Sequence, residues 1–190
     1  MIGPSQGIQN ANGTIYFVCH GSEDFLYWSN TQGRTWQAGT KFQGGNECSI
    51  AFLVNPSDGR IIMNCRTGKK NRAQLLWSPD GTMIGDISYP KGLIDPGCQG
   101  SIVNAGGQLY TSNAASTSGR ENMVVKTSTD QGQTWAEHQA VWKGPSGYSQ
   151  LVDMLHTGGD GGRSSAKIGL LFEAGREKYT ETISFALIDA

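Results

Sequence analysis

The sequence predicts an all-β fold, and three observations carry that prediction. Helical periodicity is nearly absent along the 190 residues. The apolar segments are short, of strand length, and glycine, asparagine and aspartate separate them. A turn motif also recurs at a nearly constant interval, which is typical of folds built from repeated β modules.

Twelve segments have the length and composition of strands. Alternating apolar positions, as in 14–18, predict half-buried strands, whereas the apolar run 168–172 predicts a strand that is buried on both faces. Turn chemistry separates the segments, for example at Asn12-Gly13 and Asp80-Gly81. The predicted strands are 14–20, 24–30, 48–54, 61–66, 73–78, 100–106, 108–113, 122–128, 139–142, 149–155, 167–173 and 181–188.

The repeated motif predicts the architecture. Segments 29–36 and 128–135 share an eight-residue pattern that ends in tryptophan, and 78–82 is a shortened relative. Serine and aspartate side chains can bond the backbone of a tight turn, and glycine supplies a left-handed position. The starting serines are 49 and 50 residues apart. Four strands in about 50 residues is the size of a β-propeller blade. We therefore predict about three blades, forming one partial propeller domain over 1–190 with no separate second domain.

The composition excludes several functions. Lys and Arg (15) nearly balance Asp and Glu (16), which argues against strong electrostatic binding of nucleic acid. No segment approaches the roughly 20 apolar residues of a transmembrane helix. The first residues do not read as a signal peptide, so we expect any targeting segment to lie outside this chain.

The four cysteines do not indicate a metal site. They form no CxxC pair, and the three histidines are scattered, so a structural zinc site is not expected. Cys19, Cys48 and Cys65 lie in or beside apolar runs, which predicts buried free thiols in strands. The cysteines do not indicate whether the protein occupies an oxidising or a reducing compartment, and they leave the redox state of Cys98 open.

The motifs resemble those of a known family. The pattern at 128–135 is similar to the Asp-box of sialidases and related propellers; at 29–36, Thr31 replaces the aspartate, and the box at 78–82 is truncated. An ordered set of further segments resembles the second half of an animal lysosomal-type sialidase, and it covers essentially the whole chain. These segments are 7–9 (GIQ), 46–48 (NEC), 64–66 (NCR), 97–101 (GCQGS), 119–123 (GRENM), 144–151 (GPSGYSQL), 171–173 (LFE) and 179–184 (YTETIS).

The resemblance implies a six-bladed sialidase-type propeller, of which this chain holds about three blades, and an exo-α-sialidase acting with retention. Tyr148 would be the nucleophile and Glu47 its base. A carboxylate nucleophile would be repelled by the carboxylate of sialic acid, and sialidases use tyrosine instead. A phenol with a pKa near ~10 needs a base beside it.

The resemblance also implies a binding site for the sugar carboxylate. Arg66 and Arg120 match the second and third of three arginines that converge on it, and the guanidinium fork suits a carboxylate. Arg66 ends an apolar run, where a charge is costly unless it faces a site. Arg120 lies in a Ser/Thr/Gly-rich loop and is equally consistent with a solvated surface arginine. Glu173 would orient the first arginine, and Gln99 would line the pocket.

Two elements of the family's chemistry have no counterpart here. The first arginine and the acid/base aspartate belong to the family's N-terminal half, and Asp58, Asp80 and Asp95 lie in turn contexts. General acid catalysis is typically worth about 10²–10⁴-fold. We therefore expect the isolated chain to be inactive or nearly so, with an N-terminal half or a second copy covering its open edges.

Partners and alternatives follow from the same resemblance. The expected substrates are sialylated glycoproteins, oligosaccharides and gangliosides, without metal or organic cofactor. The expected location is lysosomal or secretory, with a glycosylation sequon at Asn12-Gly13-Thr14. The alternative function is a non-catalytic sialic-acid-binding Asp-box module. The Tyr148 and Glu47 pair favours the enzyme, because a binder has no need for a base-activated phenol.

Overall fold

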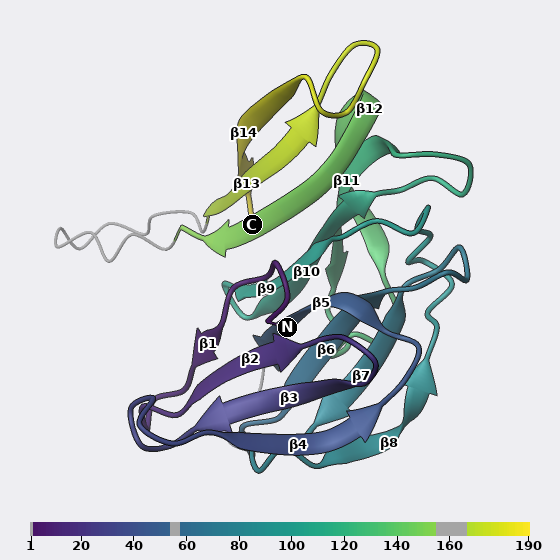
Figure 1. Ribbon diagram of the computed structural model, residues 1–190. Helices are drawn as coiled ribbons and strands as arrows, with labels where there is room; N and C mark the ends of the chain where they lie inside the picture. The colour runs from purple at the N-terminus through teal and green to yellow at the C-terminus, as the bar shows by residue number, and fades with distance from the viewer. Residues whose placement is uncertain (1, 54–57, 155–166) are drawn as a thin grey trace, which may run out of the picture.

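The computed structural model describes residues 2–53, 58–154 and 167–190, which form fourteen strands in three antiparallel sheets (Figure 1). The first sheet contains β1 (Ile8–Gln9), β2 (Ile15–Cys19), β3 (Asp24–Ser29) and β4 (Gln37–Phe42). The second contains β5 (Asn46–Phe52), β6 (Ile61–Arg66), β7 (Ala73–Trp77) and β8 (Met83–Ser88). The third contains β9 (Ser101–Ala105), β10 (Gln108–Ala114), β11 (Glu121–Ser128), β12 (Ala136–Asp153), β13 (Lys167–Ala174) and β14 (Thr182–Asp189). Within these residues, no helix has the length and apolar character that a membrane span needs.

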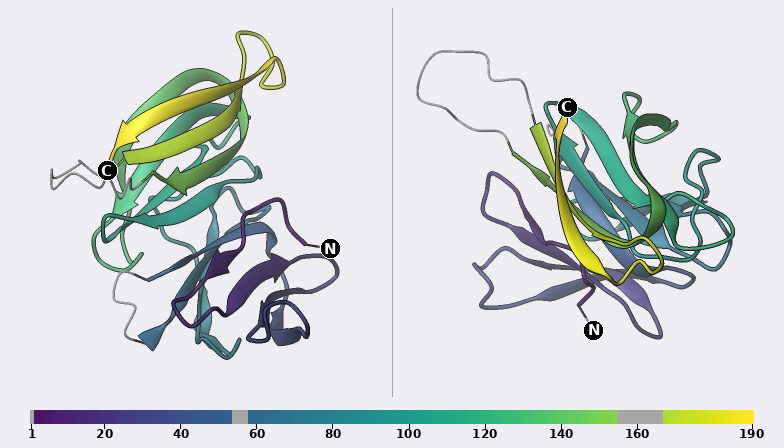
Figure 2. Two further views of the ribbon diagram at one scale, coloured as in Figure 1. Left: turned by 90° about the vertical axis from the view of Figure 1, so that its left-hand side faces the viewer. Right: turned by 90° about the horizontal axis from the view of Figure 1, so that it is seen from above.

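Strand β12 belongs to two parts of the six-stranded sheet. Its first half, from Ala136 to Pro145, pairs with β11, and its second half, from Ser146 to Asp153, pairs with β13. The sheet therefore consists of a four-stranded unit, β9 to β12, followed by a unit that starts with the second half of β12. Figure 1 and the left view of Figure 2 show the β1–β4 sheet and the β13–β14 hairpin toward opposite ends of the molecule.

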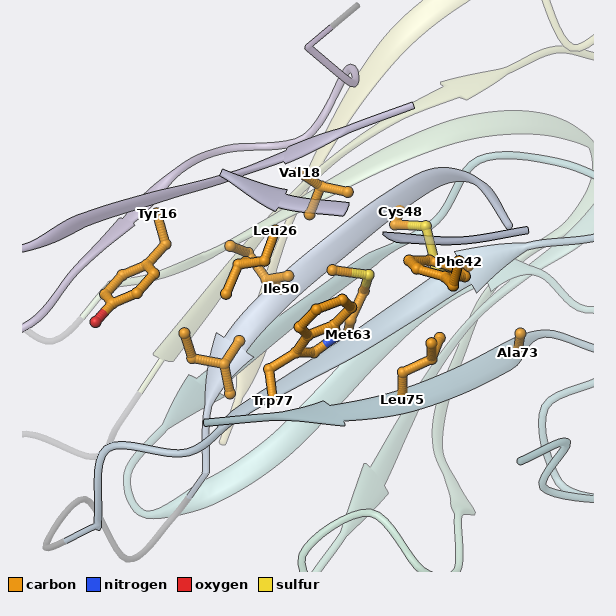
Figure 3. Close-up of a cluster of buried hydrophobic side chains, with 12 residues drawn as sticks. Tyr16, Val18, Leu26, Phe42, Cys48, Ile50, Met63, Ala73, Leu75 and Trp77 are labelled. Atoms are coloured by element: carbon orange, nitrogen blue, oxygen red, sulfur yellow. A yellow bond between two sulfur atoms is a disulfide. The ribbon is translucent and has the colours of Figure 1, made fainter. Parts of the chain in front are cut away.

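Three apolar clusters lie between successive sheet units. The first fills the space between the β1–β4 and β5–β8 sheets and includes Leu26, Met63 and Trp77 (Figure 3). The second joins the β5–β8 sheet to β9 and β10, and the third joins the two parts of the six-stranded sheet. Successive residues of one strand pack into different clusters: Ile50 packs into the first and Ala51 into the second. The β5–β8 sheet is thus buried on both faces. The prediction that 168–172 is buried on both faces was wrong for one residue of β13, because Leu171 is 49% exposed.

The two eight-residue copies of the repeated motif form the same turn. The Ser128 hydroxyl accepts the N–H of Gly132 at 2.8 Å, and the Asp130 carboxylate accepts the backbone N–H four residues further on at 2.9 Å. At 29–36, Thr31 takes the role of the aspartate, because its hydroxyl accepts the Thr35 N–H at 2.9 Å. The prediction of a turn between antiparallel strands is confirmed.

The strand prediction was correct in type and incomplete in number. Strands β1, β4 and β8 were not predicted, because β4 and β8 are largely exposed edge strands without an apolar run of strand length and β1 has two residues. The segments predicted at 139–142 and 149–155 belong to one strand, β12, which continues through Gly144 and Pro145. Residues 54 and 155, the predicted ends of two strands, lie outside the described residues.

The prediction of free thiols was wrong for two cysteines. Cys48 on β5 and Cys65 on β6 form a disulfide, with their Cα atoms 4.0 Å apart. They are neighbours across an antiparallel pair, and only the register of β5 on β6 brings them together. Cys19 and Cys98 are buried free thiols, and burial raises the pKa of the Cys98 thiol to about 11.

Candidate active site

The first strands of three successive sheet units are joined by a repeated hydrogen bond. The Ser49 hydroxyl on β5 accepts the N–H of Ile102 on β9 at 3.1 Å. The Ser101 hydroxyl on β9 accepts the N–H of Leu151 on β12 at 3.0 Å. These two contacts set β5, β9 and the second half of β12 side by side in an equivalent register.

Three of the predicted site residues take equivalent positions at the start of these strands. Glu47 lies two residues before Ser49, and Gln99 lies two residues before Ser101. Tyr148 lies two residues before Gln150, whose side-chain amide bonds Ser101. Segments separated by about 100 residues in the sequence are therefore brought together by one repeated strand position.

Glu47 and Tyr148 each lie in a β-bulge. The β5–β6 register shifts between Asn46 and Ser49, and the β12–β13 register shifts between Ser146 and Ser149. A bulge redirects a side chain relative to the regular pleat, and bulges are frequent beside active sites. Glu47 also has a φ of 41°, a left-handed conformation that costs a non-glycine residue about 1–3 kcal/mol.

The predicted base lies between the predicted nucleophile and an arginine. The Tyr148 hydroxyl donates a hydrogen bond to Oε1 of Glu47, and Nη1 of Arg66 donates to Oε2 at 2.5 Å. The side chains of Arg66 and Glu47 are 28% and 13% exposed, so the pair is shielded from bulk water but remains accessible. Burial, and then the bond to Glu47, raise the pKa of Tyr148 above its ordinary value.

Arg120 joins this group from the loop between β10 and β11. Its guanidinium carbon lies 5.5 Å from the ring centre of Tyr148 and 4.9 Å from that of Tyr179. The Arg120 carbonyl accepts the N–H of Ser146 at 2.9 Å, which ties the loop to the bulge that carries Tyr148. A guanidinium beside two aromatic rings is held by cation–π attraction, so this arginine is not a freely solvated side chain.

Glu173 and Gln99 support the backbone around Tyr148. The Glu173 carboxylate accepts the N–H of Tyr148, and the Gln99 side-chain oxygen accepts the N–H of Ser149, both at 2.9 Å. Both residues line a pocket of 190 Å³ that also includes Tyr148. Gln99 is buried, and its side-chain nitrogen donates to the Gly100 carbonyl, so both ends of its amide already bond the backbone.

Sequence reasoning missed a buried ion pair behind the site. Arg72 and Asp95 are fully buried, with 3.2 Å between Nη1 and Oδ1. Arg72 also donates to the Cys98 carbonyl at 2.8 Å, and Asp95 accepts the N–H of Gly97 at 3.1 Å. The pair therefore anchors the segment that leads into Gln99. In the sequence, Arg72 follows two lysines and Asp95 precedes a proline, so both read as ordinary loop residues.

The assembled group combines a phenol, a carboxylate and two guanidinium groups. Two cations beside a hydroxyl can bind a carboxylate-bearing ligand. The carboxylate bonded to the phenol can accept its proton. Among the described residues, no group of three or more His, Cys, Asp and Glu side chains could hold a metal ion.

Sequence comparisons identify related proteins. The family model described as "BNR repeat-like domain" matches residues 1–160. The sialidase of Micromonospora viridifaciens is 29% identical over 185 residues, which cover 91% of this chain and 27% of that protein. The exo-alpha-sialidase of Arthroderma benhamiae is 28% identical over 135 residues, which cover 68% of this chain and 31% of that protein. The chain thus spans between a quarter and a third of the length of the curated relatives it matches.

A solved structure shows the same fold. The structure titled "Hadza microbial sialidase Hz136" superposes with a TM-score of 0.77 at 24% identity, over 100% of this chain and 37% of that one. Its identity to this chain is too low to extend the likeness beyond the fold. The curated relatives are bacterial and fungal, so the animal lysosomal branch is not shown. With the family match over most of its length, the chain belongs to the BNR repeat-like family.

Proposed function

We propose that this chain supplies the C-terminal part of an exo-α-sialidase active site, as about three blades of a six-bladed propeller. The contact of the Tyr148 hydroxyl with the Glu47 carboxylate carries the proposal. Residues 101 positions apart meet there, and Arg66 and Arg120 flank them. A site that only binds an anion would have no use for this carboxylate, because it repels the ligand.

In this mechanism, Tyr148 attacks the anomeric carbon of a terminal sialic acid. The raised pKa keeps the phenol neutral in the resting site, so it does not repel the sugar carboxylate. During attack, the phenol proton passes to Oε1 of Glu47 while a bond forms between Oη and the anomeric carbon. The bond to the leaving oxygen breaks, and that oxygen takes a proton from the acid outside this chain or, in an aryl sialoside, departs as the aryl oxide. Water then attacks the anomeric carbon from the face that the leaving group left and displaces Tyr148, which takes back its proton from Glu47, so two inversions give net retention.

Arg66 and Arg120 bind the carboxylate of the sugar in this proposal. Arg66 has a second task, because its bond to Glu47 stabilises the carboxylate form that accepts the proton. Glu173 holds the N–H of Tyr148 and leaves its second oxygen for an arginine from outside the chain. Gln99 fixes the strand between the nucleophile and the base.

The first arginine of the triad and the acid/base aspartate come from further sheets in this proposal. Two observations support it: the curated relatives are three to four times longer than the matched region, and β13 and β14 expose an apolar face. That face consists of Leu171, Ile183, Phe185 and Leu187, each about half exposed or more. We propose that an N-terminal half covers it, with a second copy of this chain as the competing occupant, and that the isolated chain is inactive or nearly so.

The finer assignments extend the same proposal. The substrates would be sialylated glycoproteins, oligosaccharides and gangliosides, and the compartment lysosomal or secretory. The Cys48–Cys65 disulfide supports an oxidising route, because disulfides persist in secreted proteins and are rare in the cytosol.

A paired assay on the purified chain tests the proposal. One substrate is an aryl sialoside, whose leaving group needs little protonation, and the other is sialyllactose, whose leaving group needs the acid. We expect release from the aryl substrate alone, abolished by Tyr148→Phe and kept in Tyr27→Phe, a matched change on the β1–β4 sheet. Robust turnover of sialyllactose would refute the proposal that the isolated chain lacks the general acid. Sialic acid binding without release from either substrate, even with an N-terminal half added, would favour a non-catalytic binding module.

A further inference from the structure

The two bulges of the site are held by different means. At the Tyr148 bulge, the Glu173 carboxylate accepts the Tyr148 N–H at 2.9 Å. Gly147 makes that approach possible, because a Cβ there would come within 2.1 Å of the Glu173 carboxylate. At the Glu47 bulge, the structure shows a covalent link instead, the Cys48–Cys65 disulfide.

The disulfide lies directly beside the two ionic residues of the site. Asn46 pairs with Arg66 and Ser49 with Asn64, so Glu47 and Cys48 together face Cys65. Cys48 follows Glu47 in the chain, and Cys65 precedes Arg66. Both cysteines are fully buried members of the first apolar cluster, and Figure 3 shows Cys48 at one end of it. The link therefore joins β5 to β6 at the point where the ladder is interrupted.

We propose that the Cys48–Cys65 disulfide is a positioning device that holds Glu47 against Tyr148 and Arg66. Its catalytic meaning rests on the proposed sialidase function, whereas its effect on the Tyr148–Glu47 contact can be measured without any substrate. Cys48 and Cys65 are positioning residues, since neither touches the phenol or the guanidinium.

The backbone of Glu47 explains why the bulge needs a restraint. Its φ of 41° is unfavourable for a residue with a side chain. The two pairs of facing residues that flank the bulge, Asn46 with Arg66 and Ser49 with Asn64, do not fix the residues inside it. Without the sulfur link, Glu47 can return to a negative φ, and its side chain then leaves the Tyr148 hydroxyl. The salt bridge to Arg66 joins the ends of two partly exposed side chains, 28% and 13% exposed, and does not fix the backbone φ of Glu47.

Thiol counting tests the link itself. Alkylation of the unfolded chain without reductant should modify two of the four cysteines, Cys19 and Cys98, and all four after reduction. Modification of all four without reductant would overturn the proposal.

Proton NMR at neutral pH tests the positioning role. A phenol that donates to a carboxylate gives a downfield hydroxyl signal, which Tyr148→Phe identifies by its loss. We expect the signal to be lost in Cys48→Ala/Cys65→Ala and kept in Cys19→Ala, a matched removal of a buried thiol. The ring signals of the buried residues Tyr16 and Tyr110 report whether each variant is folded.

A second double variant separates the loss of the covalent link from the loss of packing. Cys48→Val/Cys65→Ala keeps about the same buried volume without the covalent link, and it should also lose the hydroxyl signal while staying folded. An unchanged signal in either folded double variant would overturn the proposal. Unfolding of both would also overturn it, in favour of a purely structural cross-link. Loss of the signal in the double variants, together with sialic acid binding but no release from either substrate by the parent chain even with an N-terminal half added, would support the positioning role and count against the proposed function.

Discussion

Removal of the buried carboxylate of Asp95 should be among the most destabilising single changes in this chain. The Asp95→Asn side chain keeps its shape but leaves the Arg72 guanidinium, which is fully buried, without a counter-charge. Breaking a buried pair from one side typically costs about 3–5 kcal/mol. Each kcal/mol shifts the melting temperature of a chain of this size by about 2–4 °C, so we expect a fall of about 6–20 °C.

The assay is thermal and urea unfolding beside a matched surface variant. Glu23→Gln removes one partner of the Lys41–Glu23 ion pair, whose side chains are 57% and 42% exposed. Such a pair contributes at most about 1 kcal/mol, so its loss should shift melting by only a few degrees.

A double-mutant cycle completes the test. Arg72→Met combined with Asp95→Asn should cost less than the sum of the two single changes, because the double variant leaves no unpaired guanidinium. Coupling of about 1–3 kcal/mol is expected for groups in direct contact. If Asp95→Asn costs no more than Glu23→Gln, or the single effects simply add, the reasoning about the buried charge is wrong.

Three further predictions use other parts of the chain. Burial lowers the pKa of Lys126 to about 8, so the unfolded chain binds more protons than the folded chain between about pH 8 and 10.5. The free energy of unfolding should therefore rise by about 3 kcal/mol across that range. Lys126→Met should flatten this rise when stability is measured by urea unfolding at each pH. Gly147→Ala should displace the Glu173 carboxylate from the Tyr148 N–H, and loss of the Tyr148 hydroxyl signal in a chain with unchanged melting would confirm it. Hydrogen bonds within its turn lower the pKa of Asp130 to about 2. The stability that the ionised carboxylate contributes is therefore present above its unfolded pKa and is lost as the pH falls from about 4 to 2. Asp130→Asn should have a lower melting temperature than the parent chain at pH 7 and the same one at pH 2, and equal melting temperatures at pH 7 would refute this.

Motifs that resemble those of a known family singled out Tyr148, Glu47 and Arg66 in the sequence. The structure brings these three residues together, and their catalytic roles stay predictions. β4 and β8 were not predicted, because they are largely exposed edge strands whose structure depends on pairing with β3 and β7.

The missed contacts are those that depend on register. Neither cysteine of the disulfide has a local signal, and their pairing follows only from Asn46 facing Arg66 across the bulge. Arg72 and Asp95 lie in different loops 23 positions apart, and each taken alone resembles a surface residue. Sequence pattern specifies which residues are apolar or turn-forming, whereas register decides which polar groups meet.

The sharing of β12 between two sheet units has a consequence for how the site opens. The strand that ends the β9–β12 unit continues, without a loop, into the strand that carries Tyr148. Local unfolding of one unit therefore disturbs the pairing of the next, and the free energy of local opening should be similar on both sides of Gly144. Amide hydrogen exchange along β12 should consequently show one cooperative block from Val141 to Leu151, so that the nucleophile is lost from the site only when both units open together.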